Sequence, residues 1–363
     1  MAKVQFGVHT IEEIFSQPET WKQCLAGFKQ THQLKSFGQA ISKESECVFI
    51  GCGSSYYVAL VAASTWTLLT GGPARALPAS ELLLFPQSFP NSCQPILISR
   101  SGHTSEVLEA AKFLENRLNL RTIAITCAAD TAIEKLCSRL IRLPAADERS
   151  TVMTRSFTSM LLALQILAAE RAGNYEFARS FDRLASETRP LIESVQLKIR
   201  ELVQTFHVQD FVFLGQGPFF GVAQEATLKV AEMSCSYAQS FHTLEFRHGP
   251  KAIVGPETLV TFLLTDSGYS SEVAVLKEIK NLGATTLVIG NLADPVARKS
   301  ADCLIELSID VPEAARAVAM AIPGQLLGYH VGIAKGLNPD EPRNLTRVVV
   351  LEGQDGGALH GAA

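Results

Sequence analysis

The chain has 363 residues, which is enough for about two domains that each bury a core of their own. Hydrophobic residues make up 47% of the chain and charged residues 19%, a globular composition without a disordered or low-complexity block. The net charge of −4 excludes a general basic footprint for nucleic acid and a polybasic membrane patch, so we expect a small-molecule partner, no nucleic acid and no membrane.

The first 40 residues have helical spacing and form a predicted N-terminal helical arm. Pro18 separates two expected short helices, 11–16 and 19–30, which we expect to pack on the body of the protein or on a second subunit. The N-terminus has no apolar signal segment, and no run of 18 apolar residues occurs, so a cytoplasmic location is expected. The eight cysteines show no CxxC or metal-ligand spacing, which predicts buried reduced thiols and no metal site.

From residue 48 onward the pattern changes to short apolar, β-branched runs that end in Gly, Ser, Thr or Leu. Amphipathic stretches of helical length follow these runs, and this alternation is typical of a parallel sheet covered by helices. The predicted strands of this first part are 48–51, 96–99, 122–126 and 140–143.

The same pattern is written twice along the chain. Residues 212–215, 286–289 and 304–307 repeat 48–51, 122–125 and 140–143 at an offset of 164, and 263–273 repeats 97–107 at an offset of 166. A long helical region, 156–208, lies between the copies, and a closing helix is expected at 313–336. We therefore predict an α/β fold of two tandem doubly wound parallel-sheet domains related by internal duplication. The predicted divisions are an arm (1–40), a first domain (41–195), a second domain (196–340) and a C-terminal tail (341–363).

The first candidate binding segment is Ser99-Arg-Ser-Gly-His-Thr104, which follows a predicted strand and precedes a predicted helix. Hydroxyl groups, backbone amides and the helix dipole at such a junction favour a phosphate group. The alternative is that Ser and Thr only cap the helix. The second copy has Asp266 in the place of Arg100, so only the first copy looks suited to an external anion.

A second candidate segment is the turn Gly51-Cys-Gly-Ser-Ser55, where glycine allows a ligand to approach the backbone closely. Gly53, Ser54 and Ser55 are its candidate binding residues. A dinucleotide fingerprint is the alternative, but Tyr56 breaks the G-x-G-x-x-G pattern, so no cofactor is expected.

The second domain carries Glu225, Lys229 and Glu232 on one predicted helical face. The alternative is that this Glu-Lys-Glu row is solvated, as is common on exposed helices. His248 follows 16 residues later, ahead of a Gly-Pro that breaks the chain. A carboxylate and an imidazole are the two proton carriers that aldose–ketose chemistry needs.

The chain resembles the tandem sugar isomerase (SIS) domain family, which includes the isomerase half of glucosamine-6-phosphate synthase and the aminosugar-phosphate deaminase/isomerases. The resemblance covers essentially the whole chain and implies flavodoxin-like domains. It does not extend to the glutaminase domain of the synthase, so glutamine is not expected to supply ammonia. The motifs that carry it are residues 12–18, 53–55, Ser99-Arg-Ser-Gly-His-Thr104, 148–158, Glu225-Ala-Thr-Leu-Lys229-Val-Ala-Glu232, Phe246-Arg-His-Gly-Pro250 and Asp340-Glu-Pro-Arg-Asn-Leu345.

The resemblance implies a role for each candidate residue. Ser99, Ser101 and Thr104 would hold the sugar phosphate, and Ser55 would contact the sugar. Glu232 would be the base that moves a proton between C1 and C2, with Lys229 near the same site. His248 would assist ring opening across a dimer interface, which implies a homodimer with shared active sites. Arg100 and Thr151 complete the expected substrate-binding set, in a pattern closer to the galactosamine/tagatose-phosphate branch than to the synthase.

One residue departs from the synthase pattern. Arg347 stands where the synthase has the lysine that forms a Schiff base with the ketose. A guanidinium remains protonated and cannot form that imine, although Arg347 could still contact phosphate or a sugar hydroxyl.

These residues predict an aminosugar-6-phosphate deaminase/isomerase that converts glucosamine- or galactosamine-6-phosphate to a ketose 6-phosphate and ammonia. A fructosamine-phosphate deglycase and a phosphosugar isomerase without deamination are the enzymatic alternatives. A non-catalytic sugar-phosphate sensor is the alternative of another class, but such sensors usually carry a helix-turn-helix, and neither the arm nor the net charge indicates one.

Overall fold

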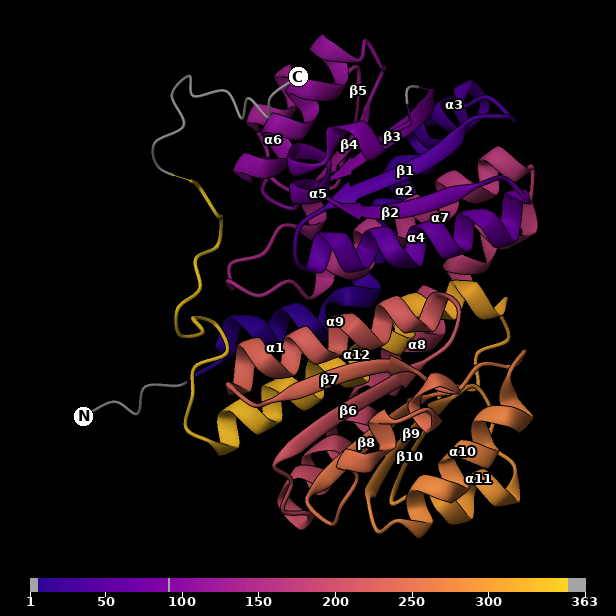
Figure 1. Ribbon diagram of the computed structural model, residues 1–363, viewed down its shortest axis with the longest axis vertical. Helices are drawn as coiled ribbons and strands as arrows, with labels where there is room; N and C mark the ends of the chain where they lie inside the picture. The colour runs from indigo at the N-terminus through magenta and orange to yellow at the C-terminus, as the bar shows by residue number, and fades with distance from the viewer. Residues whose placement is uncertain (1–5, 91, 352–363) are drawn as a thin grey trace.

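The computed structural model describes residues 6–90 and 92–351; the outer ends of the predicted arm and tail, 1–5 and 352–363, lie outside the described residues. It contains two five-stranded parallel sheets, with orders β2-β1-β3-β4-β5 and β10-β9-β8-β6-β7 (Figure 1). The first sheet consists of β1 (Glu46–Gly51), β2 (Ala74–Pro78), β3 (Cys93–Ile98), β4 (Ile123–Thr126) and β5 (Arg139–Arg142). The second consists of β6 (Asp210–Gly215), β7 (Ala238–His242), β8 (Thr258–Leu263), β9 (Thr285–Gly290) and β10 (Cys303–Glu306).

The two sheets have the same strand order once the second is numbered from β6, which confirms the tandem doubly wound fold. The edge strands β2 and β7 were absent from the sequence prediction. Their sequences, Ala-Arg-Ala-Leu-Pro and Ala-Gln-Ser-Phe-His, contain no β-branched residue and therefore lack the usual strand signal.

Helices cover both faces of each sheet. The helices are α1 (Val8–Phe15), α2 (Gln17–Thr31), α3 (Gln33–Ala40), α4 (Ser54–Thr70), α5 (Ala79–Leu84), α6 (Ser105–Lys112), α7 (Arg155–Ala172), α8 (Tyr175–Thr205), α9 (Pro218–Ser234), α10 (Tyr269–Asn281), α11 (Pro295–Ser300) and α12 (Glu313–Ala334). In β1, Cys47 and Phe49 pack in the same core as α4 and α7, whereas Val48 and Ile50 pack with α5 and α6. The strand is apolar on both faces because both are covered.

The space between the two sheets is filled by α4, α7, α9 and α12, so the domains share one helical layer (Figure 1). The layer is tightly packed where α4 meets α9. A Cβ added at Gly221 would lie 2.6 Å from a methyl carbon of Val61. This close approach brings the start of α4 next to α9, which matters for the site described below.

The N-terminal arm packs on the body of its own chain, against α7, α8 and α12. Trp21 is fully buried and donates its indole N–H to Thr158 Oγ1 at 3.0 Å, and Gln17 donates to Gln325 Oε1 at 2.8 Å. The two predicted short helices of the arm are present as α1 and α2, but the break between them lies at Ser16 and not at Pro18. Pro18 is the second residue of α2, in its first turn, where its missing N–H costs no helical hydrogen bond.

Three further features refine the sequence prediction. The predicted boundary at residue 195 lies inside the 31-residue helix α8, which therefore spans it. Helix α12 is long and apolar enough to cross a membrane by composition, but 83% of its most apolar window is buried inside the protein, as expected of a core helix. All eight cysteines are free, but the prediction that they are buried holds for four of them, Cys24, Cys47, Cys127 and Cys303. Cys52, Cys93 and Cys137 are half-buried, and Cys235 is exposed at the end of α9.

Candidate active site

The glycine turns after β1 and β6 place the first residues of α4 and α9. A Cβ at Gly51 would lie 2.6 Å from the carbonyl of Ser55, so the chain turns directly from strand into helix. Gly53 has a φ of +55°, a left-handed conformation that suits glycine. The turn after β6 repeats this geometry with Gly217 at +51°. Ser54, the first residue of α4, is held by the turn at the carboxyl end of the first sheet.

Ser54 meets three ionisable residues of α9 in a buried cluster that joins the two domains. Its hydroxyl donates to Glu225 Oε1 at 3.1 Å and accepts from Lys229 Nζ at 3.2 Å. Lys229 Nζ also lies 3.3 Å from Glu225 Oε1 and pairs with Glu232 Oε2. The side chains of Lys229 and Glu225 are 0% and 1% exposed, whereas that of Glu232 is 17% exposed. Glu232 is therefore the charged member of the cluster that a ligand can reach.

Burial sets the charges of this cluster. It raises the pKa of Glu225 to about 8, against the opposing effect of the neighbouring Lys229 charge. Burial alone would lower the pKa of Lys229, but the carboxylates of Glu225 and Glu232 outweigh it, so the net shift is upward. The ammonium of Lys229 is therefore present at neutral pH, held beside Glu232.

The loop between β3 and α6, residues 99–104, gathers hydroxyl groups at the start of a helix. Ser99 Oγ accepts from the Gly102 N–H at 3.0 Å and lies 3.3 Å from Thr104 Oγ1, while Ser101 Oγ accepts from the His103 N–H at 3.2 Å. Gly102 has a φ of +63°. Since β1 and β3 are paired and parallel, this loop and the Ser54 turn lie at the same edge of the sheet. We call residues 99–104 the first loop.

The equivalent residues 265–270 of the second domain form the second loop, and a side chain of the same protein occupies it. Glu313, the first residue of α12, accepts from the Asp266 N–H at 2.7 Å and from the Ser267 N–H and hydroxyl at 3.4 and 2.6 Å. Within residues 6–90 and 92–351, no carboxylate accepts from the matching N–H groups of Arg100 and Ser101. The two loops therefore differ in that a carboxylate of the described chain accepts from these donors in the second loop and not in the first.

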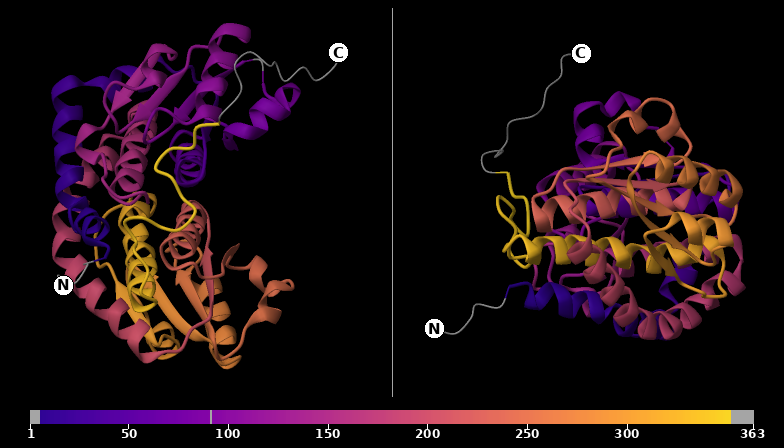
Figure 2. Two further views of the ribbon diagram at one scale, coloured as in Figure 1. Left: turned by 90° about the vertical axis from the view of Figure 1, so that its left-hand side faces the viewer. Right: turned by 90° about the horizontal axis from the view of Figure 1, so that it is seen from below.

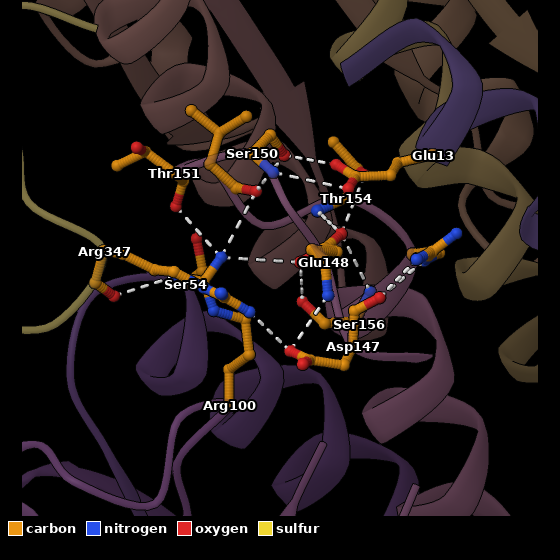
Figure 3. A network of polar contacts seen from close by, with 12 residues as sticks. Glu13, Ser54, Arg100, Asp147, Glu148, Ser150, Thr151, Thr154, Ser156 and Arg347 are labelled. Atoms are coloured by element: carbon orange, nitrogen blue, oxygen red, sulfur yellow. Dashed lines mark hydrogen bonds and ion pairs between the residues drawn. The ribbon is translucent and has the colours of Figure 1, made fainter. Parts of the chain in front are cut away.

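Arg100 is 6% exposed, and its guanidinium contacts groups of the protein (Figure 3). It donates to the carbonyls of Thr151 at 2.9 Å and Arg347 at 2.8 Å, and lies 3.5 Å from Glu148 Oε2. These contacts tie the first loop to the segment after β5 and to the tail. Substrate binding by the Arg100 side chain stays a prediction.

Two buried carboxylates hold the segment after β5 in place (Figure 3). Glu148 accepts from the N–H and hydroxyl of Thr154 at 2.7 and 2.8 Å and from the N–H of Ser156 at 3.2 Å. Glu13 of the arm accepts from the N–H and hydroxyl of Ser150. Burial, with the nearby charge of Glu148, raises the pKa of Glu13. The arm thus supports the side of the site that faces Arg100.

The C-terminal tail runs from the second domain to the first (Figure 2, left). There it contacts the start of α6. The Ser105 N–H donates to the carbonyl of Val349 at 3.3 Å, and the Leu351 N–H donates to Ser105 Oγ at 3.1 Å. The side chain of Arg347 donates to Asp147 Oδ1 at 2.7 Å. The tail therefore lies beside the first loop, with the guanidinium of Arg347 on a carboxylate at the surface.

The remaining predicted residues lie in different surroundings. Thr151 is half-buried and donates its N–H to the carbonyl of Asp340 at 3.0 Å, and Ser55 is buried in the first turn of α4. His248 is exposed, at the end of a short 3₁₀ helix (Glu245–Arg247) in the connection between β7 and β8. The structure thus groups the Ser54 turn with Lys229 and Glu232, and Arg100 with Thr151 and Arg347, but leaves His248 on the surface.

Sequence reasoning did not select Glu225, Glu13, Glu148 or Glu313 as site residues. Glu225 was one of the charged residues noted on the face of α9, and Glu13 and Glu148 lie in motifs of the family resemblance. Glu13 and Glu313 bind loops more than 40 residues away, and no local pattern in the sequence signals such a contact.

This geometry defines a class of protein: a doubly wound pair of domains with a hydroxyl-rich loop and a carboxylate–lysine cluster at strand ends. The SIS domain family model matches residues 40–170 and 207–334, so the chain belongs to the SIS domain family.

The chain is similar to proteins of three different activities. The chain is 32% identical to the glucosamine-6-phosphate deaminase of Thermotoga maritima, covering 94% of this chain and 100% of that one with a TM-score of 0.79. It is 26% identical over 344 residues to the glutamine–fructose-6-phosphate aminotransferase (isomerizing) of Methanothermobacter thermautotrophicus, spanning 94% of this chain but 57% of that protein. The tagatose-6-phosphate ketose/aldose isomerase of Escherichia coli, 21% identical with a TM-score of 0.82 over 96% of this chain and 97% of that one, has the same fold.

Proposed function

We propose that this protein is a hexosamine-6-phosphate deaminase/isomerase that acts on glucosamine- or galactosamine-6-phosphate. The observation that carries the proposal is the partly exposed carboxylate of Glu232, paired with a buried, charged Lys229 next to the turn that leads the first domain's sheet into α4. The first loop supplies the complementary phosphate site. The 32% identity to a glucosamine-6-phosphate deaminase over that whole chain favours this reaction among the candidates.

In the proposed reaction the phosphate of the open-chain substrate binds the hydroxyls of Ser99, Ser101 and Thr104. Glu232 removes the C2 proton, while the oxygen of the C1 aldehyde gains a proton, giving a 1,2-enolamine. Proton transfer to C1 then gives an imine at C2. Water adds to this imine and ammonia leaves, which produces the ketose 6-phosphate. The ammonium of Lys229 stabilises negative charge that develops on the substrate.

The proposed direction needs no covalent lysine. Arg347 cannot form an imine because its guanidinium stays protonated. Lys229 is a poor substitute, since its pKa is raised and an imine-forming lysine needs a free amine. Both observations favour imine hydrolysis on the substrate over the Schiff-base route of the synthase.

We also propose a homodimer with shared active sites in the cytoplasm. His248 is exposed on the β7–β8 connection, so a neighbouring subunit is the arrangement that would bring an imidazole to the substrate for ring opening. The eight free cysteines favour a reducing compartment.

The test is to incubate the protein with each hexosamine 6-phosphate and to measure ammonia. Release of ammonia with at least one substrate is expected, and its absence with both would contradict deamination. The same reaction in D₂O, followed by proton NMR, separates the alternatives. Loss of the C2 proton signal without ammonia indicates a simple isomerase, and binding without exchange indicates a sensor. Release of an amine from a fructosamine 6-phosphate indicates the deglycase.

A further inference from the structure

The second loop has the hydrogen-bond donors of an anion site, and a side chain of the same protein, Glu313, fills it. Its framework matches the first loop, since Thr265 Oγ1 accepts from the Gly268 N–H at 2.8 Å as Ser99 Oγ does from Gly102. Glu313 accepts hydrogen bonds from the N–H groups of Asp266 and Ser267 and from the Ser267 hydroxyl. The second loop therefore binds a carboxylate of its own chain.

A buried cation stands beside the second loop. Arg316, one turn further along α12, is 3% exposed and pairs with the Asp266 carboxylate. Its Nε is buried and has no hydrogen-bond partner among residues 6–90 and 92–351. An unused guanidinium donor of this kind favours an anion with several oxygens, because planar N–H groups match phosphate and carboxylate geometry. The positive charge also offsets that of Asp266, which would otherwise repel an anion.

An open hollow of about 470 Å³ adjoins the second loop. It is lined by Asp266, Tyr269, Asn291 and Asp294 together with two apolar residues. This volume is in the range of small-ligand sites, and the carboxylate, amide and phenol groups suit hydroxyl or amino groups. A ligand that fits both the second loop and the hollow carries a phosphate at one end and polar groups on the rest.

We propose that the second loop is a second site for a phosphate monoester of a polyhydroxy compound, which the chain keeps closed with the carboxylate of Glu313. Glu313 thereby limits each chain to one phosphosugar. Removing this carboxylate leaves the N–H groups of Asp266 and Ser267, the Ser267 hydroxyl and Arg316 available to an external phosphate. The ligand class rests on the proposed function, but the presence of the closed site does not.

The test counts bound phosphate. The full chain and its Glu313→Ala variant are titrated with inorganic phosphate by isothermal calorimetry and equilibrium dialysis, and then with glucosamine 6-phosphate. We expect the variant to bind one more equivalent of each than the wild type. Glu313→Ala combined with Ser267→Ala should return to the wild-type count. Glu176→Ala, which removes an exposed carboxylate from the first turn of α8, is the matched control for charge and should not gain a site.

The outcomes separate the two proposals. An unchanged count in a folded Glu313→Ala variant would overturn the closed site, as would two equivalents in the wild type. None in the wild type and one in the variant would contradict the first-loop phosphate site and support the closed one. If thermal melting shows that Glu313→Ala does not fold, Glu313→Ser, whose side chain is too short to fill the loop, is titrated in its place and judged by the same counts.

Discussion

The first and second loops lie at equivalent places in two copies of one fold, yet a carboxylate of the described chain fills only the second. In the first loop, the hydroxyls of Ser99, Ser101 and Thr104 lie at a helix start that no carboxylate of the described chain fills. In the second, Glu313 accepts the corresponding hydrogen bonds. The two copies therefore share their strand order and loop framework, and they differ in the charged residues around each loop.

The helices that follow the loops show the same difference. α6 begins at Ser105, whereas α10 begins at Tyr269, which is the equivalent of His103 and so two positions earlier. Gly102 has a φ of +63°, but Gly268 has a φ of −103°. The first loop thus has two more non-helical residues than the second before its helix begins. The second domain contributes α9 instead, with Lys229 and Glu232.

The largest expected effect tests the proposed catalytic role of the second domain. Glu232→Gln should lower kcat for ammonia release by about 10²- to 10⁴-fold with little change in KM, because the variant loses the proton acceptor but keeps a side chain of the same size. Steady-state kinetics measures this. Glu19→Gln, on the exposed face of α2, is the control and should retain wild-type rates. Equal turnover in both variants would remove Glu232 from the mechanism.

The next effect compares the loops directly. Ser101→Ala should weaken phosphate binding about 10- to 100-fold, since a hydrogen bond to a charged group contributes about 1.5–3 kcal/mol. Ser267→Ala, the same change in the second loop, should leave phosphate affinity within about twofold, because Ser267 binds Glu313. Calorimetric titration gives both affinities. Equal losses in the two variants would mean that the loops do not differ as described.

A smaller effect concerns stability near the second loop. Burial raises the pKa of Glu272 to about 7, so the folded protein holds this proton more tightly than the unfolded chain does. Stability from this group is complete below the unfolded pKa of about 4.5 and is lost as the pH rises through about 7. Glu272→Gln should remove on the order of 1–2 kcal/mol of this dependence in urea denaturation at pH 5 and 7.5. An identical pH slope in variant and wild type would contradict the assignment.

The smallest effect is expected at Arg347. Its side chain pairs with Asp147 at the surface, and the Arg100 contact uses its backbone carbonyl, which Arg347→Ala keeps. An exposed pair contributes about 0.2–1 kcal/mol, so kcat/KM should change by about fivefold or less. Kinetics with the variant checks this. A loss of a hundredfold would show that the guanidinium leaves Asp147 to bind substrate.

Much of the fold was predictable because the sequence repeats at a nearly constant offset and its buried strands are continuously apolar. Strands β1, β3, β4 and β5 and their copies in the second sheet were therefore found. β2 and β7 were missed because edge strands with Ala, Gln and Ser carry little strand signal. Ser99, Ser101 and Thr104 were found because their hydroxyls are adjacent in sequence.

The rest of the site depends on contacts between distant segments. Sequence spacing placed Glu225, Lys229 and Glu232 on one face of a helix, but it could not show that Ser54 completes the cluster from the other domain. Arg100 was selected for its charge. Only the structure shows that its guanidinium is buried and contacts backbone carbonyls and Glu148. Predicting such contacts requires the packing of α4 on α9, which no local pattern encodes.

The most direct measurement is a crystal structure of the protein with glucosamine 6-phosphate bound. The predicted result is phosphate density on the hydroxyls of Ser99, Ser101 and Thr104, the C2 carbon next to Glu232, and the Glu313 carboxylate still seated in the second loop. Phosphate density in the second loop with Glu313 displaced, or a phosphate bound away from the first loop, would contradict the division of roles between the two copies.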